Sequence, residues 1–173
     1  MILVLTIGLH IVDNVSKNLF ISRRDARGDG RFVFTPWDMD ASLGALPNGT
    51  CYNGTYDNTT PDAGNISNAA PFKMLWADNC LNFRTRTANR WFELQQGVLA
   101  ADSVGLRMQA YADGFVCSGA WERERLRWND DNYCFVVDDP NDEIALVMQW
   151  YARWNDTLAD FFTPYRTNDA DTS

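Results

Sequence analysis

The segment DNVSKNLFISRRDARGDGRFVFTPWDMDASLG, residues 13–44, decides the fold expected of this chain. Two β-prone runs, residues 19–22 (LFIS) and 31–35 (RFVFT), flank the polar sequence RRDARGDG, which is rich in turn-forming residues. This pattern predicts a β-hairpin with a longer loop. Pro36 ends the second run because proline has no amide hydrogen to donate to a sheet ladder.

Acidic and amide side chains lie at the two open ends of this hairpin. Asp13 is followed five residues later by Asn18, and Asp38 and Asp40 follow the second strand. An Asp, then an Asn five residues later, then a further Asp is the order of base and metal ligands in the catalytic half of a protein kinase. Phosphoryl transfer needs a carboxylate to accept the hydroxyl proton, and it needs oxygen ligands for Mg²⁺. The hairpin would bring Asn18 and Asp38 close in space.

The same residues resemble the CotH (spore coat protein H) kinase family, which has this Asp and Asn, an aromatic-rich strand pair and the motif Pro-Trp-Asp-x-Asp, here residues 36–40. The resemblance implies an atypical protein kinase that uses ATP and Mg²⁺ (or Mn²⁺) and acts on a protein hydroxyl. It gives Asp13 the catalytic role and Asp38 a metal-ligand role. Asn18 is expected as a further ligand. Asp40 shares a face with Asp38 in extended backbone, so it is a second ligand or an orienting group.

Two basic residues close to Asp13 each allow two interpretations. Lys17 either contacts a nucleotide phosphate, whose charge an ammonium would offset, or is a solvated loop lysine. His10 lies three residues before Asp13, and we interpret it as a core or loop-packing histidine and not as a catalytic group. Trp37 is expected to pack beneath the hairpin and aim Asp38 outward, and Gly44 to supply a positive φ as the chain leaves the site.

The first twelve residues, MILVLTIGLHIV, predict a buried helix that leads to Asp13. The run is shorter than the roughly 20 apolar residues of a membrane span, and it lacks the flanks of a signal peptide. A kinase also needs a nucleotide-cradling lobe with a phosphate-pairing Lys, which would precede Asp13. We therefore expect residues 1–165 to be one partial domain and residues 166–173 a polar tail, with this chain alone nearly inactive.

Bulk composition narrows the class of protein. The 173 residues suit a single domain, and 46% apolar residues with seven Trp indicate a folded globule. A net charge of −8 argues against binding to nucleic acid or to an anionic membrane surface. The family resemblance implies an extracellular or cell-envelope location.

The segment over residues 45–70 is polar and aperiodic, and we interpret it as a candidate lid or substrate-facing loop. It holds four Asn-x-Ser/Thr sequons, which either accept glycans or arise from composition alone. Further sequons begin at Asn14 and at Asn155. Disulfide pairing and free thiols both remain open for the four cysteines, which are Cys51, Cys80, Cys117 and Cys134.

Beyond residue 70 the apolar residues recur at helical spacing. Helices are expected from Pro71, over 84–98, from an Asp102-Ser103 cap to about 115, over 121–128, and from Asn141 to Pro164. On the first, one helical face carries Phe72, Leu75, Trp76 and Cys80. The last is expected to carry a core stripe of Ile144, Val147, Met148, Tyr151, Trp154, Leu158, Phe161 and Phe162. Arg84, Arg86 and Arg90 are either solvated or ion-paired, or one of them binds a phosphate or a partner's carboxylate.

These patterns predict an α+β fold like a kinase C-lobe, mostly helical, with a small β-hairpin that carries the acidic site. The alternative function on the same fold is a non-enzymatic cell-surface or envelope interaction module, since some proteins of the resembled family are adhesins.

Overall fold

A computed structural model of the chain describes residues 2–11, 18–23, 30, 32–39, 42–44, 70–128 and 139–166. The elements in chain order are α1 (Ile2–Gly8), β1 (Leu19–Arg23), β2 (Phe32–Pro36), α3 (Ala70–Asp78), the 3-10 turn η2 (Cys80–Asn82), α4 (Phe83–Gln95), α5 (Ala101–Cys117), α6 (Ala120–Trp128), α7 (Pro140–Phe162) and the 3-10 turn η3 (Thr163–Tyr165). The described residues are mostly helical with one two-stranded antiparallel sheet, which confirms the predicted α+β class.

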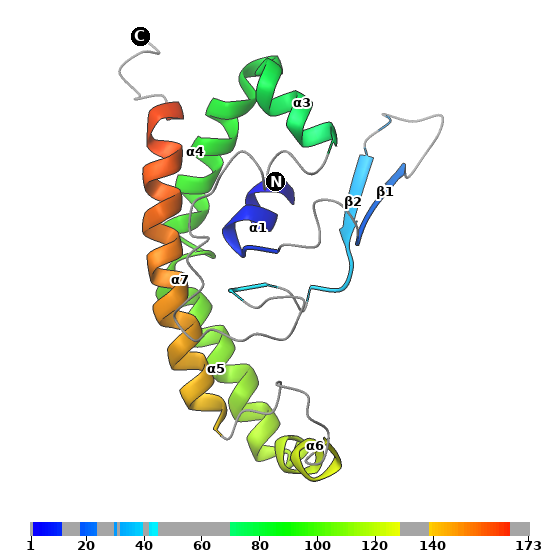
Figure 1. The fold of residues 1–173 in the computed structure, drawn as a ribbon, viewed down its shortest axis with the longest axis vertical. Helices are drawn as coiled ribbons and strands as arrows, with labels where there is room; N and C mark the ends of the chain where they lie inside the picture. The colour runs from blue at the N-terminus through cyan, green and yellow to red at the C-terminus, as the bar shows by residue number, and fades with distance from the viewer. Residues whose placement is uncertain are drawn as a thin grey trace.

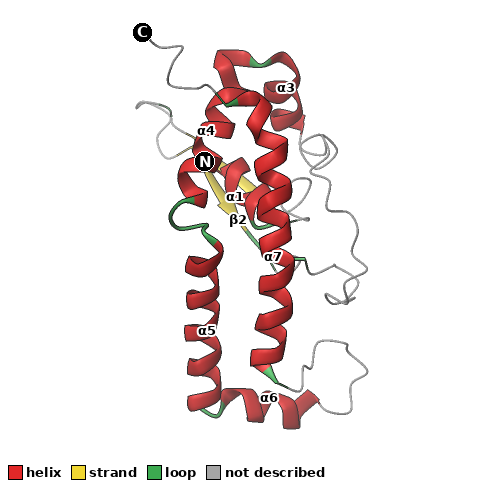
Figure 2. Ribbon diagram, turned by 90° about the vertical axis from the view of Figure 1, so that its left-hand side faces the viewer, coloured by secondary structure: helices red, strands yellow, loops and turns green. Residues whose placement is uncertain are grey.

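The long helix α7 packs against both α4 and α5. It runs beside α4 over one half of its length and beside α5 over the other (Figure 1). Figure 2 shows α5 and α7 side by side, with α6 crossing at the far end from α3. The short helix α1 packs against α4, and the hairpin lies on the side of α1 away from α7 (Figure 1).

Helix α7 forms because apolar residues recur along it at helical spacing and because its first turn is capped. The Asp139 carboxylate accepts a hydrogen bond from the Asn141 amide at 2.8 Å, and Pro140 fills the first helical position. The predicted stripe is buried or half-buried, but the helix also buries Trp150 and Asn155, which the stripe did not include. The reason is that α7 packs on α4 and α5 and also against the end of α1.

The apolar start of the chain is a buried helix, as predicted, and α1 contributes Leu3, Val4 and Ile7 to the core. Gly8 lies against Trp91 of α4, where an added Cβ would come within 2.8 Å of the ring. The helix is shorter than the apolar run because His10 has a left-handed backbone, with φ at 49°. Helix α1 therefore ends at Gly8, five residues before Asp13 in the sequence.

Two local expectations were wrong. Cys80 does not share a helical face with Phe72 and Trp76, because Asn79 takes a left-handed conformation (φ 49°) and α3 stops at Asp78, and the Cys80 side chain is exposed. Helix α5 begins at Ala101 without a side-chain cap, so Asp102 lies inside the first turn, where its carboxylate faces the positive end of the helix.

Several predictions fall on residues outside the described ranges, including all but the last residue of the candidate lid over 45–70, Cys51, Cys134 and most of the polar tail. Cys80 and Cys117 are free, exposed thiols. Within the described part of the chain, none of the helices has the length and apolar character required to cross a membrane.

Candidate functional site

The register of the hairpin brings Asn18 and Asp38 together. Leu19 pairs with Pro36 at the open end of the sheet, and one step further out the Trp37 amide donates to the Asn18 carbonyl at 2.8 Å. The Asn18 Nδ2 then lies 3.5 Å from the Asp38 Oδ2, although the two residues are 20 positions apart. The hairpin thus supplies an amide and a carboxylate that face each other.

The two residues also end the strand conformation at this point. Both have left-handed backbones, with φ at 58° for Asn18 and 57° for Asp38. Asn and Asp are the non-glycine residues that tolerate this conformation best, because their short polar side chains can hydrogen-bond locally. The Asp38 side chain is exposed, and 3.5 Å is the outer limit of a hydrogen bond, so a cation could displace this contact.

The donor chemistry of this pair fits a hard divalent cation. Carboxylate and amide oxygens are the ligands that Mg²⁺ prefers in proteins. In this structure Asn18 presents Nδ2 to Asp38, so its carbonyl oxygen would share a cation with Asp38 only after the amide turns over. The part of the chain that the structure describes contains no group of three His, Cys, Asp or Glu residues suited to a metal.

The other three predicted site residues, Asp13, Lys17 and Asp40, lie outside the described residues. Their roles therefore stay predictions. Their neighbours in sequence are held in place, because α1 and residues 42–44 are fixed against each other. The Leu43 amide donates to the Leu9 carbonyl at 2.8 Å, which ties the segment after Asp38 to the end of α1.

Gly44 has a φ of 90°, as expected from the sequence, and it lies directly on the indole ring of Trp150. A Cβ at this position would come within 2.8 Å of the ring, so the close approach of the backbone requires glycine. This contact packs the segment that follows Asp38 against α7.

His10 is a core residue, which confirms its interpretation. It is buried between Trp150 and Trp154, with ring centroids 5.3 and 4.8 Å away. Burial lowers the pKa of His10 to about 4, so the imidazole is neutral near pH 7. Trp150 was not predicted from the sequence to be a partner of His10. The apolar stripe predicted for the last helix contains Tyr151 and Trp154 but not Trp150.

Trp37 was expected to pack beneath the hairpin, but its side chain is 65% exposed. The packed face of the hairpin is formed instead by Leu19 and Phe34, and the Phe34 ring lies 6.0 Å from that of Phe72 in α3. The opposite face is open, with Phe20 60% exposed. An apolar exposed surface therefore begins two residues from Asn18.

The three arginines of α4 have different environments. Arg84 is structural, because its guanidinium donates to the carbonyls of Trp76 and Ala77 at 2.7 and 2.8 Å and so caps the end of α3. Arg90 forms an ion pair with Glu93 one turn away. The Arg86 guanidinium has neither a hydrogen bond nor an ion pair within the described ranges.

Comparison with known proteins gives one match. The model of the family described as CotH kinase protein matches residues 1–163, which is nearly the whole chain. No curated protein and no solved structure matches this chain.

Proposed function

This chain belongs to the CotH kinase family, and from that membership we propose that it is part of a domain that transfers a phosphoryl group from ATP to a protein hydroxyl. The observation that carries the proposal is the contact between Asn18 and Asp38, which places an amide and a carboxylate together at the open end of the hairpin. We infer that this end of the hairpin is the catalytic end of the full-length domain.

The proposed roles follow from the chemistry of each group. The Asp13 carboxylate accepts the proton of the attacking hydroxyl, and the Lys17 ammonium faces a phosphate. Asn18, Asp38 and Asp40 would supply oxygen ligands for Mg²⁺ or Mn²⁺. The bound cation would supply positive charge that offsets the negative charge of the nucleotide phosphates. The helical body acts as the C-lobe of an atypical kinase, which holds these groups in position.

The open face of the hairpin supports nucleotide binding at the same end. Phe20 and Val33 lie on this face, exposed and within a few residues of Asn18 and Asp38. A nucleobase or the apolar surface of another lobe would be buried there at little cost in polar contacts. An extracellular or envelope location remains part of the proposal on the basis of the family.

Calorimetric titration of Mg²⁺ and Mn²⁺, with and without ATP, tests the proposal. We expect Asp38→Asn to weaken cation binding by at least about tenfold, because it removes a charge from the ligand set without changing its shape. Asp160→Asn is the matched control, since Asp160 is an exposed carboxylate on α7. Equal affinity in the wild type and Asp38→Asn would place the cation elsewhere and overturn the assignment.

The second candidate function, an interaction module, is favoured by the surface of α5 and α6. Leu106, Tyr111 and Leu126 are each more than 70% exposed, which is unusual for large apolar side chains. Such residues suit burial against another protein. Absence of any cation binding, together with self-association that is lost in Leu106→Ser, would favour this function over phosphoryl transfer.

A further inference from the structure

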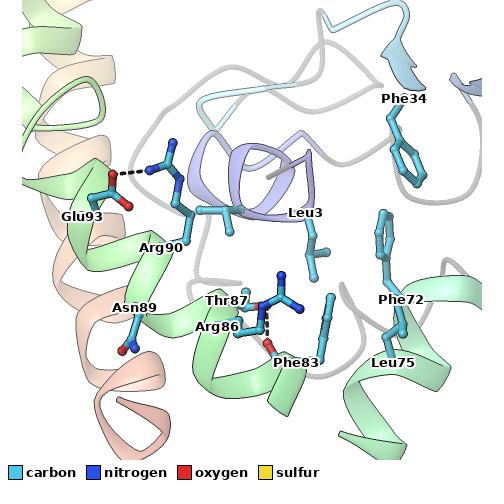
Figure 3. A pocket seen from close by; sticks show the side chains of 11 residues that line it. Leu3, Phe34, Phe72, Leu75, Phe83, Arg86, Thr87, Asn89, Arg90 and Glu93 are labelled. Atoms are coloured by element: carbon cyan, nitrogen blue, oxygen red, sulfur yellow. Dashed lines mark hydrogen bonds and ion pairs between the residues drawn. The ribbon is translucent and has the colours of Figure 1, made fainter. Parts of the chain in front are cut away.

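A cavity of about 620 Å³ lies between α1, β2, α3 and α4, and its lining includes neither Asn18 nor Asp38 (Figure 3). Cavities of roughly 300–1,000 Å³ with mostly apolar walls are typical of small-molecule sites. Its apolar lining consists of Leu3, Val4, Phe34, Phe72, Leu75 and Phe83. The size and lining point to a small ligand with a hydrocarbon body.

The walls of the cavity are anchored in the core. Leu3, Val4 and Phe72 are buried and belong to the main hydrophobic cluster, and Phe34 packs against Phe72. The hydroxyl of Thr87 donates to the Phe83 carbonyl at 2.7 Å, which occupies its hydrogen within α4. A ligand would therefore meet a preformed apolar surface formed by α1, β2 and α3, and on the α4 side it would meet the polar residues of the lining, which are Arg86, Thr87, Asn89, Arg90 and Glu93.

The lining of the cavity carries more positive than negative charge. Arg86, Arg90 and Glu93 leave one net positive charge, and Glu93 is already paired with Arg90. Figure 3 shows the Arg90 guanidinium turned toward Glu93, and the Arg86 guanidinium turned toward Leu3 and Phe83. Arg86 has no anionic partner in the described part of the chain, so a ligand carboxylate could pair with its planar fork through two hydrogen bonds.

We propose that this cavity binds a small organic acid, with its hydrocarbon body on the apolar lining and its carboxylate on Arg86. A single negative charge suits the site better than a phosphate dianion, because Glu93 lines the same cavity and the chain carries a net charge of −8. The ligand class is therefore an aliphatic or aromatic monocarboxylate. This site is independent of phosphoryl transfer, and its occupation requires no divalent cation.

The test uses decanoate as the acid and decanol as its neutral analogue, titrated calorimetrically below the micelle concentration. We expect decanoate to bind with one-to-one stoichiometry, and Arg86→Met to weaken its binding by about tenfold or more while leaving decanol unchanged. Arg125→Met, at an exposed position on α6, is the matched control and should bind decanoate like the wild type. Leu75→Trp narrows the cavity and should weaken both ligands.

Equal decanoate affinity in the wild type and Arg86→Met would overturn the proposal. So would wild-type binding of decanol as tight as that of decanoate, because the carboxylate would then have no partner. Failure of decanoate to bind, together with a dimer that dissociates in Arg86→Met, would show that the cavity holds a second copy of the chain.

Discussion

The indole nitrogen of Trp154 donates a buried hydrogen bond to the backbone carbonyl of Ile7 at 2.9 Å, across 147 positions of sequence. Ile7 lies in the last turn of α1, where carbonyl groups lack helical partners. The same carbonyl also accepts the His10 amide at 3.0 Å. The last helix of the domain thus fixes the end of the first helix, from which the chain continues to Asp13.

Trp154→Phe should lower the free energy of unfolding by about 1–3 kcal/mol, because it removes this hydrogen bond and part of a fully buried ring. Urea denaturation measures the loss. Trp128→Phe is the control: its indole is partly exposed, donates to the exposed Glu124 carboxylate and lies beside the Arg127 guanidinium, so we expect a change below about 1 kcal/mol. Equal effects of the two substitutions would contradict the anchoring role of Trp154.

Gly44→Ala should destabilise the protein by about 1–3 kcal/mol, because a methyl group would meet the Trp150 ring and the backbone would keep a left-handed conformation. The matched control is Gly114→Ala within α5. An added Cβ at Gly114 meets nothing within 4 Å, so alanine should stabilise the helix by about 0.5–1 kcal/mol. Thermal unfolding should show a lower midpoint for Gly44→Ala and a higher midpoint for Gly114→Ala than for the wild type. A Gly44→Ala protein as stable as the wild type would mean that the segment after Asp38 moves away from α7 freely.

The hairpin and the long helix could be predicted from sequence because each depends on local pattern. The β-prone runs and Pro36 determine the strands, and the regular apolar spacing up to Pro164 determines α7. The contact between Asn18 and Asp38 follows from the hairpin, so the approach of these two of the five candidate site residues could also be predicted from sequence.

The remaining features depend on tertiary contacts that no local pattern encodes. The sequence predicted that Trp37 packs beneath the hairpin. The hairpin instead contacts the helical body through Phe34, whose ring packs against Phe72 of α3. The cavity beside Arg86 arises only where α1, β2, α3 and α4 meet. Asn155 begins an Asn-x-Ser/Thr sequon. Its side chain is buried in α7, with an exposed fraction of 6%, so a glycan does not fit at this position.

The stability of the folded chain should depend on pH through His10. Its pKa is about 4 in the fold against an ordinary value of 6.5, so the unfolded chain binds a proton first as the pH falls. The free energy of unfolding should therefore decrease between about pH 6.5 and pH 4, by an amount on the order of 3 kcal/mol from this group, with no further loss below that range.

His10→Asn isolates this contribution, because Asn tolerates the left-handed backbone and does not titrate. Urea midpoints at about pH 7 and about pH 4.5 should differ less in the variant than in the wild type. Carboxyl groups such as Glu143, whose pKa is raised by burial, titrate in both proteins and cancel in the comparison. The same pH dependence in both proteins would show that His10 is not the titrating group.

A double-mutant cycle on Asn18 and Asp38 tests whether the two side chains hold one cation. If both coordinate the same Mn²⁺, Asn18→Ala and Asp38→Ala should each weaken binding, and the double variant should lose less than the product of the two effects, because the second substitution removes a ligand from a site already broken. We expect a coupling of about threefold or more, which corresponds to roughly 0.6 kcal/mol. Independent effects would instead mean that the 3.5 Å contact between the amide and the carboxylate only closes the end of the hairpin. The cation site would then have to be built from Asp13, Asp40 or other residues.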